Sequence, residues 1–159
     1  MTKDQISTYT MRISQANTSA LAVVLYDIIL DAVKEGLQHY ENEELADFEV
    51  SVQQAQAFLQ KLMAMSKLDT QTGCDVMSLY LFIDKQLLMS YVKRMPVNLT
   101  QCIGLLERLR GSFMEISKRD YDPPLMEHVQ QVYAGLTYGK GYLKESRDPM
   151  QEQNRGLQA

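Results

Sequence analysis

The sequence predicts an all-α protein, specifically an antiparallel four-helix bundle with an N-terminal arm and an additional C-terminal helix. No stretch alternates apolar and polar residues over the length of a strand, and glycine and proline are largely confined to junctions. Apolar residues instead recur every three or four positions in successive segments, which is the spacing of one helix face. Short connections then make consecutive helices antiparallel neighbours.

The first 16 residues are expected to form an extended arm. The arm carries Ile6, Tyr9 and Ile13 in otherwise polar surroundings. Apolar side chains on an otherwise polar segment are expected to be buried against another apolar surface. We therefore expect the arm to lie over an apolar surface of the bundle and to act as a lid.

The first bundle helix starts at Asn17 or Thr18, because either side chain can accept a hydrogen bond from a free amide of the first turn, and it runs to about Tyr40. Its apolar residues span roughly 240° of a helical wheel, against the ~100° stripe of a surface helix. Asp27 and Asp31 lie one turn apart on its polar side, which favours a solvated face. The wide apolar face predicts cover on more than one side.

The second helix follows the acidic stretch ENEELAD and ends at KLDTQTG, where Gly73 can take a positive φ. Its core-facing stripe consists of Phe48, Val52, Ala55, Leu59 and Leu62. The third helix runs from Cys74 to about Met95, and Pro96 with Asn98 ends it and caps the fourth. The face of the fourth helix consists of Leu99, Cys102, Ile103, Leu106, Leu109 and Phe113.

The C-terminal part begins at RDYDPP, which breaks the chain after the bundle at residues 17–118. A fifth helical segment is expected over 119–145, with Pro123 or Pro124 in its first turn. Its residues in helical register are Leu125, Val129, Val132 and Leu136. Residues 146–159 are polar, and we expect them to be disordered.

The third helix carries two apolar stripes about 100° apart on the wheel. The first consists of Val76, Leu79, Tyr80, Ile83, Leu87 and Tyr91, and the second of Met77, Leu81, Leu88, Val92 and Met95. One stripe can face the bundle, so the other needs the fifth segment or a partner. The ten methionines suit irregular core gaps as well as adaptable binding surfaces.

Composition and charge exclude several function classes. The net charge of -4, with no basic stripe, argues against binding to nucleic acid. The N-terminus lacks an apolar signal core and no run approaches ~18 apolar residues, so we expect a cytoplasmic protein without membrane insertion. Two cysteines are too few for a disulfide framework or a metal cage, and Cys74 and Cys102 both fall where a helix could bury a thiol.

The sequence also offers no catalytic constellation. His39 and His128 are the only histidines, neither lies three residues after a glutamate, and a solvated or capping role fits both. No glycine-rich phosphate loop follows a strand. We therefore expect no enzyme activity, no catalytic or metal site and no cofactor.

Four stretches, in order, resemble a known family: LAVVLYDIILDAV, KLDTQTG, LYLFIDKQLL and GLLERLRGSF. Together with Ile6-Ser-Thr-Tyr9 in the arm, they are similar to the motifs of the FliS family over about residues 6–117. Three departures stand out. QANTSA replaces the usual Thr/Ser-Ala-Ser-Pro, the interval from Gly73 to Leu79 is about one helical turn shorter, and the C-terminal extension is longer.

The resemblance implies a helical flagellin export chaperone. Such a protein binds the C-terminal segment of flagellin in the cytosol, holds it unpolymerised and helps to deliver it to the export gate protein FlhA. The resemblance further implies a monomer when this client is bound, with a homodimer as an alternative in the free state.

The apolar stripes and the family pattern together predict a client-binding groove. Its border on the bundle side is expected to consist of Leu79, Tyr80, Ile83 and Leu87, with Leu25 and Ile29 from the first helix. The residues expected to contact client directly are Met77, Leu81, Leu88 and Met95. The lid residues Ile6, Tyr9 and Ile13 would be displaced by client.

Two alternatives stay open. A structural bundle that homodimerises through the same stripes, with no client, would also cover them. A signalling bundle with a phosphorylated histidine ranks third, because neither His39 nor His128 has a His-x-x-Lys setting.

Overall fold

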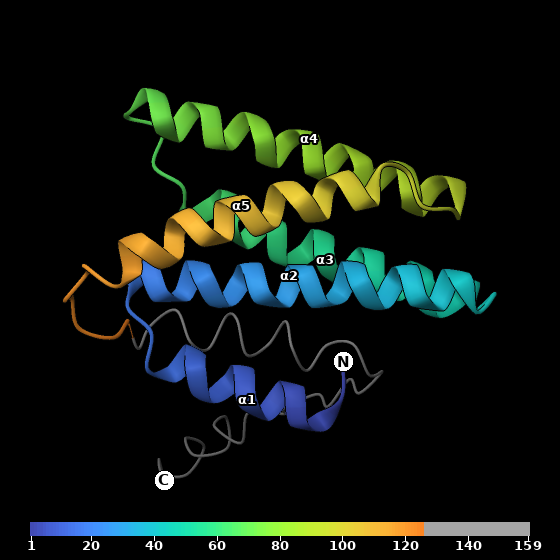
Figure 1. Cartoon of the computed structure of the whole chain (residues 1–159), viewed down its shortest axis with the longest axis horizontal. Coiled ribbons are helices and arrows are strands. Elements are labelled where there is room, and N and C mark those ends of the chain that lie inside the picture. Colours follow the sequence, from blue (N-terminus) through green and yellow to red (C-terminus); the bar gives the residue numbers. More distant parts are fainter. Residues whose placement is uncertain (126–159) are drawn as a thin grey trace, which may run out of the picture.

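The computed structural model describes residues 1–125, and within that range it contains five helices and no strand. The helices are α1 (Lys3–Ser14), α2 (Thr18–Glu41), α3 (Leu45–Met65), α4 (Gln71–Lys93) and α5 (Leu99–Ser117) (Figure 1). The all-α class is therefore confirmed for this part of the chain. None of these helices has the length and apolar character needed to cross a membrane.

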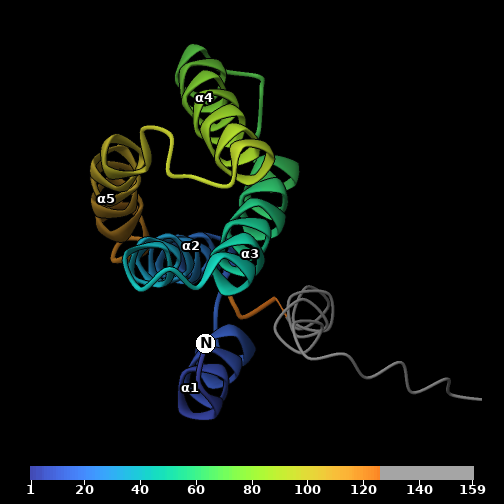
Figure 2. The same ribbon diagram turned by 90° about the vertical axis from the view of Figure 1, so that its right-hand side faces the viewer.

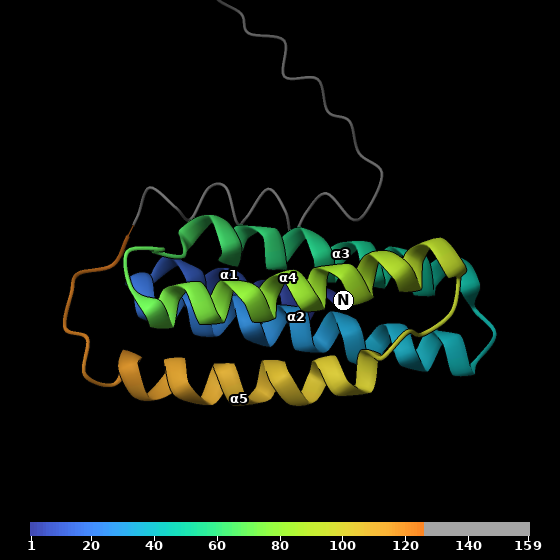
Figure 3. The ribbon, with the colours of Figure 1, turned by 90° about the horizontal axis from the view of Figure 1, so that it is seen from above.

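The four long helices lie side by side and alternate in direction along the chain, as the colours in Figure 1 show. Helix α2 packs against α3 and α5, which lie on opposite sides of it when seen from above (Figure 3). Helix α4 packs mainly on α3 and less extensively on α5. Helix α1 packs on α2, on the side away from α4 (Figure 2). The arm and α4 therefore occupy opposite sides of the molecule.

Helix α2 is the central element of the core. Its fully buried side chains are Leu25, Tyr26, Ile28, Ile29, Ala32 and Val33, each with 0% exposure. Because α1, α3 and α5 all pack on it, the prediction that this helix is covered on more than one side is confirmed. That cover comes from within the chain.

The predicted core stripes of the neighbouring helices also lie in the core. All five residues of the stripe on α3 are buried, and Leu99, Cys102 and Leu106 are buried on α5. The half-buried residues of the α5 face are Ile103, Leu109 and Phe113, which pack against the core. Burial raises the pKa of the Cys102 thiol to about 11. Cys74 is exposed, so the prediction that a helix buries its thiol is wrong.

The arm is helical, so the expectation of an extended segment is wrong. The Thr2 side chain accepts from the Gln5 N–H (3.2 Å), and the Gln5 side chain accepts from the Thr2 N–H (2.6 Å), which forms a capping box. Ile6, Tyr9 and Ile13 are three and four residues apart, so a helix places all three on one face. Packing of that face on α2 stabilises a helix that would be too short to persist alone.

The start of α2 is fixed by Asn17. Its side-chain oxygen accepts from the Ala20 N–H (2.9 Å), so Asn17 rather than Thr18 is the N-cap. Asn98 also occupies an N-cap position, with φ of 53°, but its side chain donates to Gln86 Oε1 (3.1 Å) and does not cap α5. The predicted capping role of Asn98 is therefore wrong.

Gly73 has a different role from the expected one. It lies in the first turn of α4, where its N–H donates to the Thr70 hydroxyl (3.1 Å), and it does not form a positive-φ turn. A Cβ at this position would lie 2.0 Å from the Lys67 carbonyl oxygen. Glycine is therefore required by the close approach of the preceding loop.

Residues 119–125 of the predicted fifth helical segment are described, and they contain no helix. The rest of that segment, including His128, and the predicted disordered tail at 146–159 lie outside the described residues.

Replacement of Gly73 by alanine tests the close approach at the start of α4. We expect Gly73→Ala to lower the free energy of unfolding by about 1–3 kcal/mol, because backbone must move to admit the methyl group. Gly111→Ala is the matched control: nothing lies within 4 Å of its Cβ, so helix propensity should make it neutral or stabilising by up to ~1 kcal/mol. Urea denaturation measures both, and equal effects would contradict the packing argument.

Candidate partner-binding surface

Helix α4 has one face in the core and a second apolar face in solvent. Tyr80, Ile83 and Leu87 are fully buried on the core face. The second apolar surface consists of Met77, Leu81, Leu88 and Val92 of α4 together with Met95, which follows the C-cap Arg94, and we call it the α4 stripe. Leu81 is 54% exposed, Leu88 46%, Val92 67% and Met95 46%, whereas Met77 is half-buried against the core.

The α4 stripe runs beside α3 and has a polar border there. Asp84, three residues after Leu81, accepts from Gln56 Nε2 of α3 (3.0 Å). Near the C-terminal end of α4, Arg94 Nε lies 2.7 Å from Glu49 Oε1 of α3. These contacts hold α4 against α3 while the apolar side chains beside them stay uncovered. The result is a line of apolar groups that could receive one face of an amphipathic helix.

Beneath α4, two tyrosines connect it to the centre of the bundle. The hydroxyl groups of Tyr26 and Tyr80 hydrogen-bond to each other inside the core. Burial raises the pKa of both hydroxyls, so both stay protonated at neutral pH. The Tyr26 ring also packs on Phe113 of α5, with ring centroids 5.4 Å apart. The tyrosine pair therefore fixes the part of the core against which α4 packs.

The predicted groove residues separate into accessible and buried sets. Tyr80, Ile83 and Leu87 lie on the bundle side of α4, whereas Leu79 is 36% exposed and does not lie inside the bundle. Leu25 and Ile29 have no exposed surface, so they belong to the core and cannot line an open groove in this structure. Among the predicted groove residues, accessible apolar surface is therefore found on α4 and on Met95 just after it.

The arm covers α2 and leaves the α4 stripe open. Ile13 is 1% exposed and Tyr9 7%, and Ile6 is half-buried against the core. Figure 2 shows α1 on one side of the α2 and α3 pair and α4 on the other. The expectation that the arm covers the groove next to Leu88 is therefore not met in this arrangement.

Three acidic residues of α2, spaced four positions apart, bind the arm. We call Asp27, Asp31 and Glu35 the acidic ladder. The Tyr9 hydroxyl donates to Asp31 Oδ2 (2.6 Å), and Arg12 Nη2 donates to Asp27 Oδ2 (2.5 Å). Asp27 and Asp31 therefore do not form the solvated face predicted for them, because the polar side of α2 is the surface on which the arm docks.

The residues at the two ends of the acidic ladder, Glu35 and Asp27, make further contacts. Gln5 Nε2 donates to Glu35 Oε1 (3.3 Å), so the arm residues meet the ladder in antiparallel order. Arg110 of α5 binds the second oxygen of Asp27, and this hydrogen bond raises the pKa of Arg110. The Asp27 side chain is only 13% exposed. A carboxylate so placed is stabilised by its two arginines, which come from two different helices.

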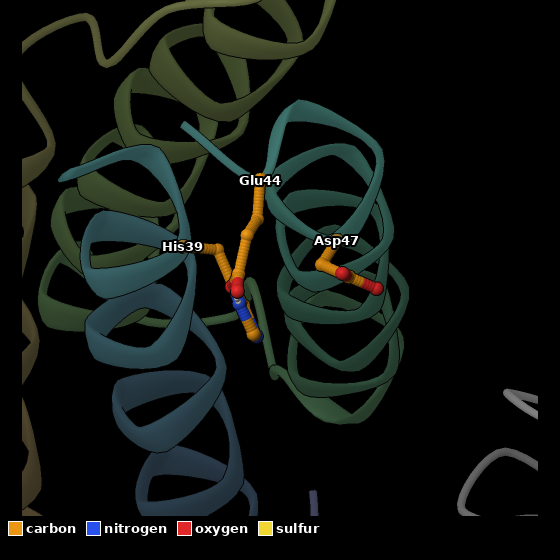
Figure 4. Close-up of side chains that lie close together, drawn as sticks. All are labelled: His39, Glu44 and Asp47. Carbon is orange, nitrogen blue, oxygen red and sulfur yellow. Dashed lines mark hydrogen bonds and ion pairs between the residues drawn. The ribbon is translucent and has the colours of Figure 1, made fainter. Parts of the chain in front are cut away.

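The part of the chain that the structure describes contains one group of three side chains of the types that bind metals. His39, Glu44 and Asp47 lie at the junction of α2 and α3, with potential ligand atoms within 4.8 Å of one another. Figure 4 shows His39 and Glu44 directed toward each other, and His39 Nδ1 lies 2.5 Å from Glu44 Oε2. We interpret this exposed group as a contact that holds the ends of the two helices together.

Comparison with known families agrees with the motifs and the helical arrangement. The family model described as flagellar protein FliS matches residues 2–120. The chain belongs to the FliS family. Comparisons with curated proteins and with solved structures gave no match. The FliS-like motif residues have clear structural roles here, since Tyr26 and Tyr80 form the buried hydroxyl pair and Asp27 joins α1, α2 and α5.

The sequence contained a signal for the docking site of the arm that the periodicity of apolar residues alone did not reveal. Asp27, Asp31 and Glu35 recur every four residues, and the polar residues Gln5 and Arg12 flank Tyr9 at helical spacing. Two helices with complementary polar residues at matching intervals indicate a docked pair. By contrast, nothing local indicates that Arg110 reaches Asp27, because 83 positions separate them.

The buried tyrosine pair predicts that replacing the two hydroxyls has non-additive effects. Tyr80→Phe leaves the Tyr26 hydroxyl without its partner in the core, which should cost about 1–3 kcal/mol of unfolding free energy. Tyr26→Phe should have a similar cost, because it leaves the Tyr80 hydroxyl unpaired in the core. The double variant should cost less than the sum of the two, since no unpaired hydroxyl remains on either side. Urea denaturation of the three variants checks this, and additive effects would exclude a coupled pair.

Proposed function

We propose that this FliS-family chain is a cytosolic flagellar export chaperone that binds the C-terminal helical segment of flagellin. In this proposal it keeps the segment from polymerising prematurely and assists its delivery to the export gate protein FlhA. The observation that carries the proposal is the α4 stripe, on which Leu81, Leu88, Val92 and Met95 form one accessible apolar surface. FliS is a family of chaperones rather than of enzymes, which supports the same conclusion.

The physical basis of binding is burial of apolar surface. An amphipathic client helix laid along α4 removes Leu81, Leu88, Val92 and Met95 from water, at roughly 25 cal/mol per Å² of apolar area. A disordered client loses conformational entropy when it becomes helical, which offsets part of this gain. The net affinity is therefore moderate for the area buried. Moderate affinity suits a client that must be released, and no nucleotide is needed.

The arm has a second role in the proposal, as a lid over α2. It is attached by one apolar face and by polar contacts to the acidic ladder, which are hydrogen bonds that a competing segment can replace. A client longer than the α4 stripe could displace the arm and bind where Ile6, Tyr9 and Ile13 now pack. The lid would then cover a second docking surface on α2, separate from the stripe.

The oligomeric state follows from the same surface. A client helix on α4 leaves the complex with one copy of the chaperone, because the stripe is occupied. In the free state, two copies could bury their stripes against each other in an isologous contact. This homodimer without client is the alternative function that the stripe also supports.

Titration calorimetry with a synthetic peptide of the last forty or so residues of the host flagellin tests the main proposal. We expect one-to-one binding with a negative heat-capacity change, because apolar surface is buried as the client folds. Leu88→Asp should weaken binding by at least about tenfold while the helical content is unchanged, because Leu88 is exposed. Val50→Asp is the control, since Val50 is 50% exposed but lies on α3 outside the stripe.

Three results would contradict this proposal. Absence of heat and of a complex would indicate that the stripe has no flagellin client, and a doubled mass in light scattering would then favour the homodimer. Equal weakening by Leu88→Asp and Val50→Asp would exclude the stripe as the site. Loss of helical content in Leu88→Asp would place Leu88 in the core.

The lid proposal has its own test. Combined replacement of Ile6 and Tyr9 by alanine should destabilise the docked arm and strengthen binding of the flagellin peptide severalfold, because less free energy is spent on displacing the arm. Thermal unfolding and calorimetry measure the two effects. If both the stability of the free protein and the affinity stay unchanged, the arm is not a lid.

A further inference from the structure

The chain that follows α5 returns to the point where the arm joins the bundle. The end of α5 and the start of α2 lie at the same end of the molecule (Figure 1). There the Leu125 N–H donates to the Ala16 carbonyl oxygen (2.9 Å). Ala16 lies between α1 and α2 and is 3% exposed. Two segments more than a hundred residues apart therefore meet at the junction of the arm and the bundle.

Asn17 has two simultaneous roles at this junction. Its side-chain oxygen caps α2 by accepting from the Ala20 N–H, and its side-chain nitrogen donates to the carbonyl oxygens of Asp120 (3.1 Å) and Asp122 (3.3 Å). Serine and aspartate cap helices about as well as asparagine does, but neither side chain can also donate two hydrogen bonds. The second role therefore requires asparagine specifically.

Asp120 adds a further contact and shapes the returning segment. Its carboxylate accepts from the Ser19 hydroxyl through one oxygen and from the Asp122 N–H through the other (3.1 Å). The hydrogen bond from Ser19 lowers the pKa of Asp120, so this carboxylate is ionised at neutral pH. The segment is thus turned by its own hydrogen bond and fixed to the first turn of α2.

We propose that residues 120–125 form a latch that controls release of the arm. The arm can leave α2 only if the backbone between Ser14 and Asn17 rotates, because α2 is held in the core from its first turns. The hydrogen bond from Leu125 to the Ala16 carbonyl oxygen fixes that backbone directly, and the side-chain contacts of Asn17 and Ser19 hold residues 120–122 in place beside it. Opening the arm therefore strains or breaks the latch. The two events are thermodynamically coupled.

This inference goes beyond the proposed function, because it concerns the free protein and requires no client. The match to the FliS family ends at residue 120, so most of the latch lies outside the matched region. The latch gives the C-terminal part of this chain a means of adjusting how often the arm opens.

Hydrogen exchange of the full chain, followed residue by residue by NMR, tests the latch. Asn17→Ser retains a good N-cap but cannot donate two hydrogen bonds to residues 120 and 122. We expect the amides of α1 to exchange roughly tenfold faster in this variant, while those of α3 are unchanged. Ser19→Ala should act in the same direction without altering the cap. Ser112→Ala, an exposed serine on α5, is the control and should have no effect.

Coupling also requires the reciprocal effect. Arg12→Ala loosens the arm without touching the latch, and it should accelerate exchange of the Leu125 amide, which is bonded to Ala16. Unchanged exchange in α1 for both Asn17→Ser and Ser19→Ala would overturn the latch. So would unchanged exchange at Leu125 in Arg12→Ala. Equal acceleration of α1 and α3 in Asn17→Ser would mean that Asn17 acts only through the stability of α2, which also overturns it.

Discussion

Helix α2 is apolar around most of its circumference, and no single neighbour can cover it. A helix of this kind is stable in water only when several elements pack on it at once. Helices α3 and α5 cover two sides, and α1 covers a third through Ile13 and Tyr9. The helical arm is thus part of the solution to a packing constraint set by α2. Because packing on α2 places α1 beside the acidic ladder, the polar residues of α1 can contact Asp27, Asp31 and Glu35.

The same arrangement explains why α4 is the helix left with uncovered surface. Helix α4 packs mainly on α3, and its contact with α2 is made through Tyr80 rather than along its length. A helix at the periphery of a bundle buries one face and exposes its other faces to solvent. In α4 the neighbouring face is apolar as well, whereas polar residues would be expected there in a bundle without a partner. The difference between α2 and α4 is therefore one of position: both have wide apolar surfaces, but only one of them is surrounded.

Much of the fold followed from the sequence, because apolar periodicity and caps are local properties. The core stripe of α3, the start of α2 at Asn17 or Thr18 and the apolar stripe with Leu88 were all predicted from residues within a few positions of each other. Two errors concern contacts between distant segments: the arm is helical because α2 supports it, and Asp27 is enclosed because Arg12 and Arg110 reach it. A third concerns the path of a loop, since Gly73 is required because Lys67 of the preceding loop passes close by. The periodicity of apolar residues does not predict these contacts, although the four-residue spacing of the acidic ladder partly indicated where the arm docks.

The hydroxyl pair of Tyr26 and Tyr80 has a consequence for how α4 presents its surface. Apolar packing between parallel rows of side chains is non-directional, so a purely apolar interface leaves neighbouring helix registers close in free energy. A single directional hydrogen bond in the dry core distinguishes one register from those a turn above or below, because any sliding of α4 along its axis would leave two buried hydroxyls unpaired. The pair therefore sets the axial position of α4, and with it the heights at which Leu81, Leu88 and Met95 meet a binding helix.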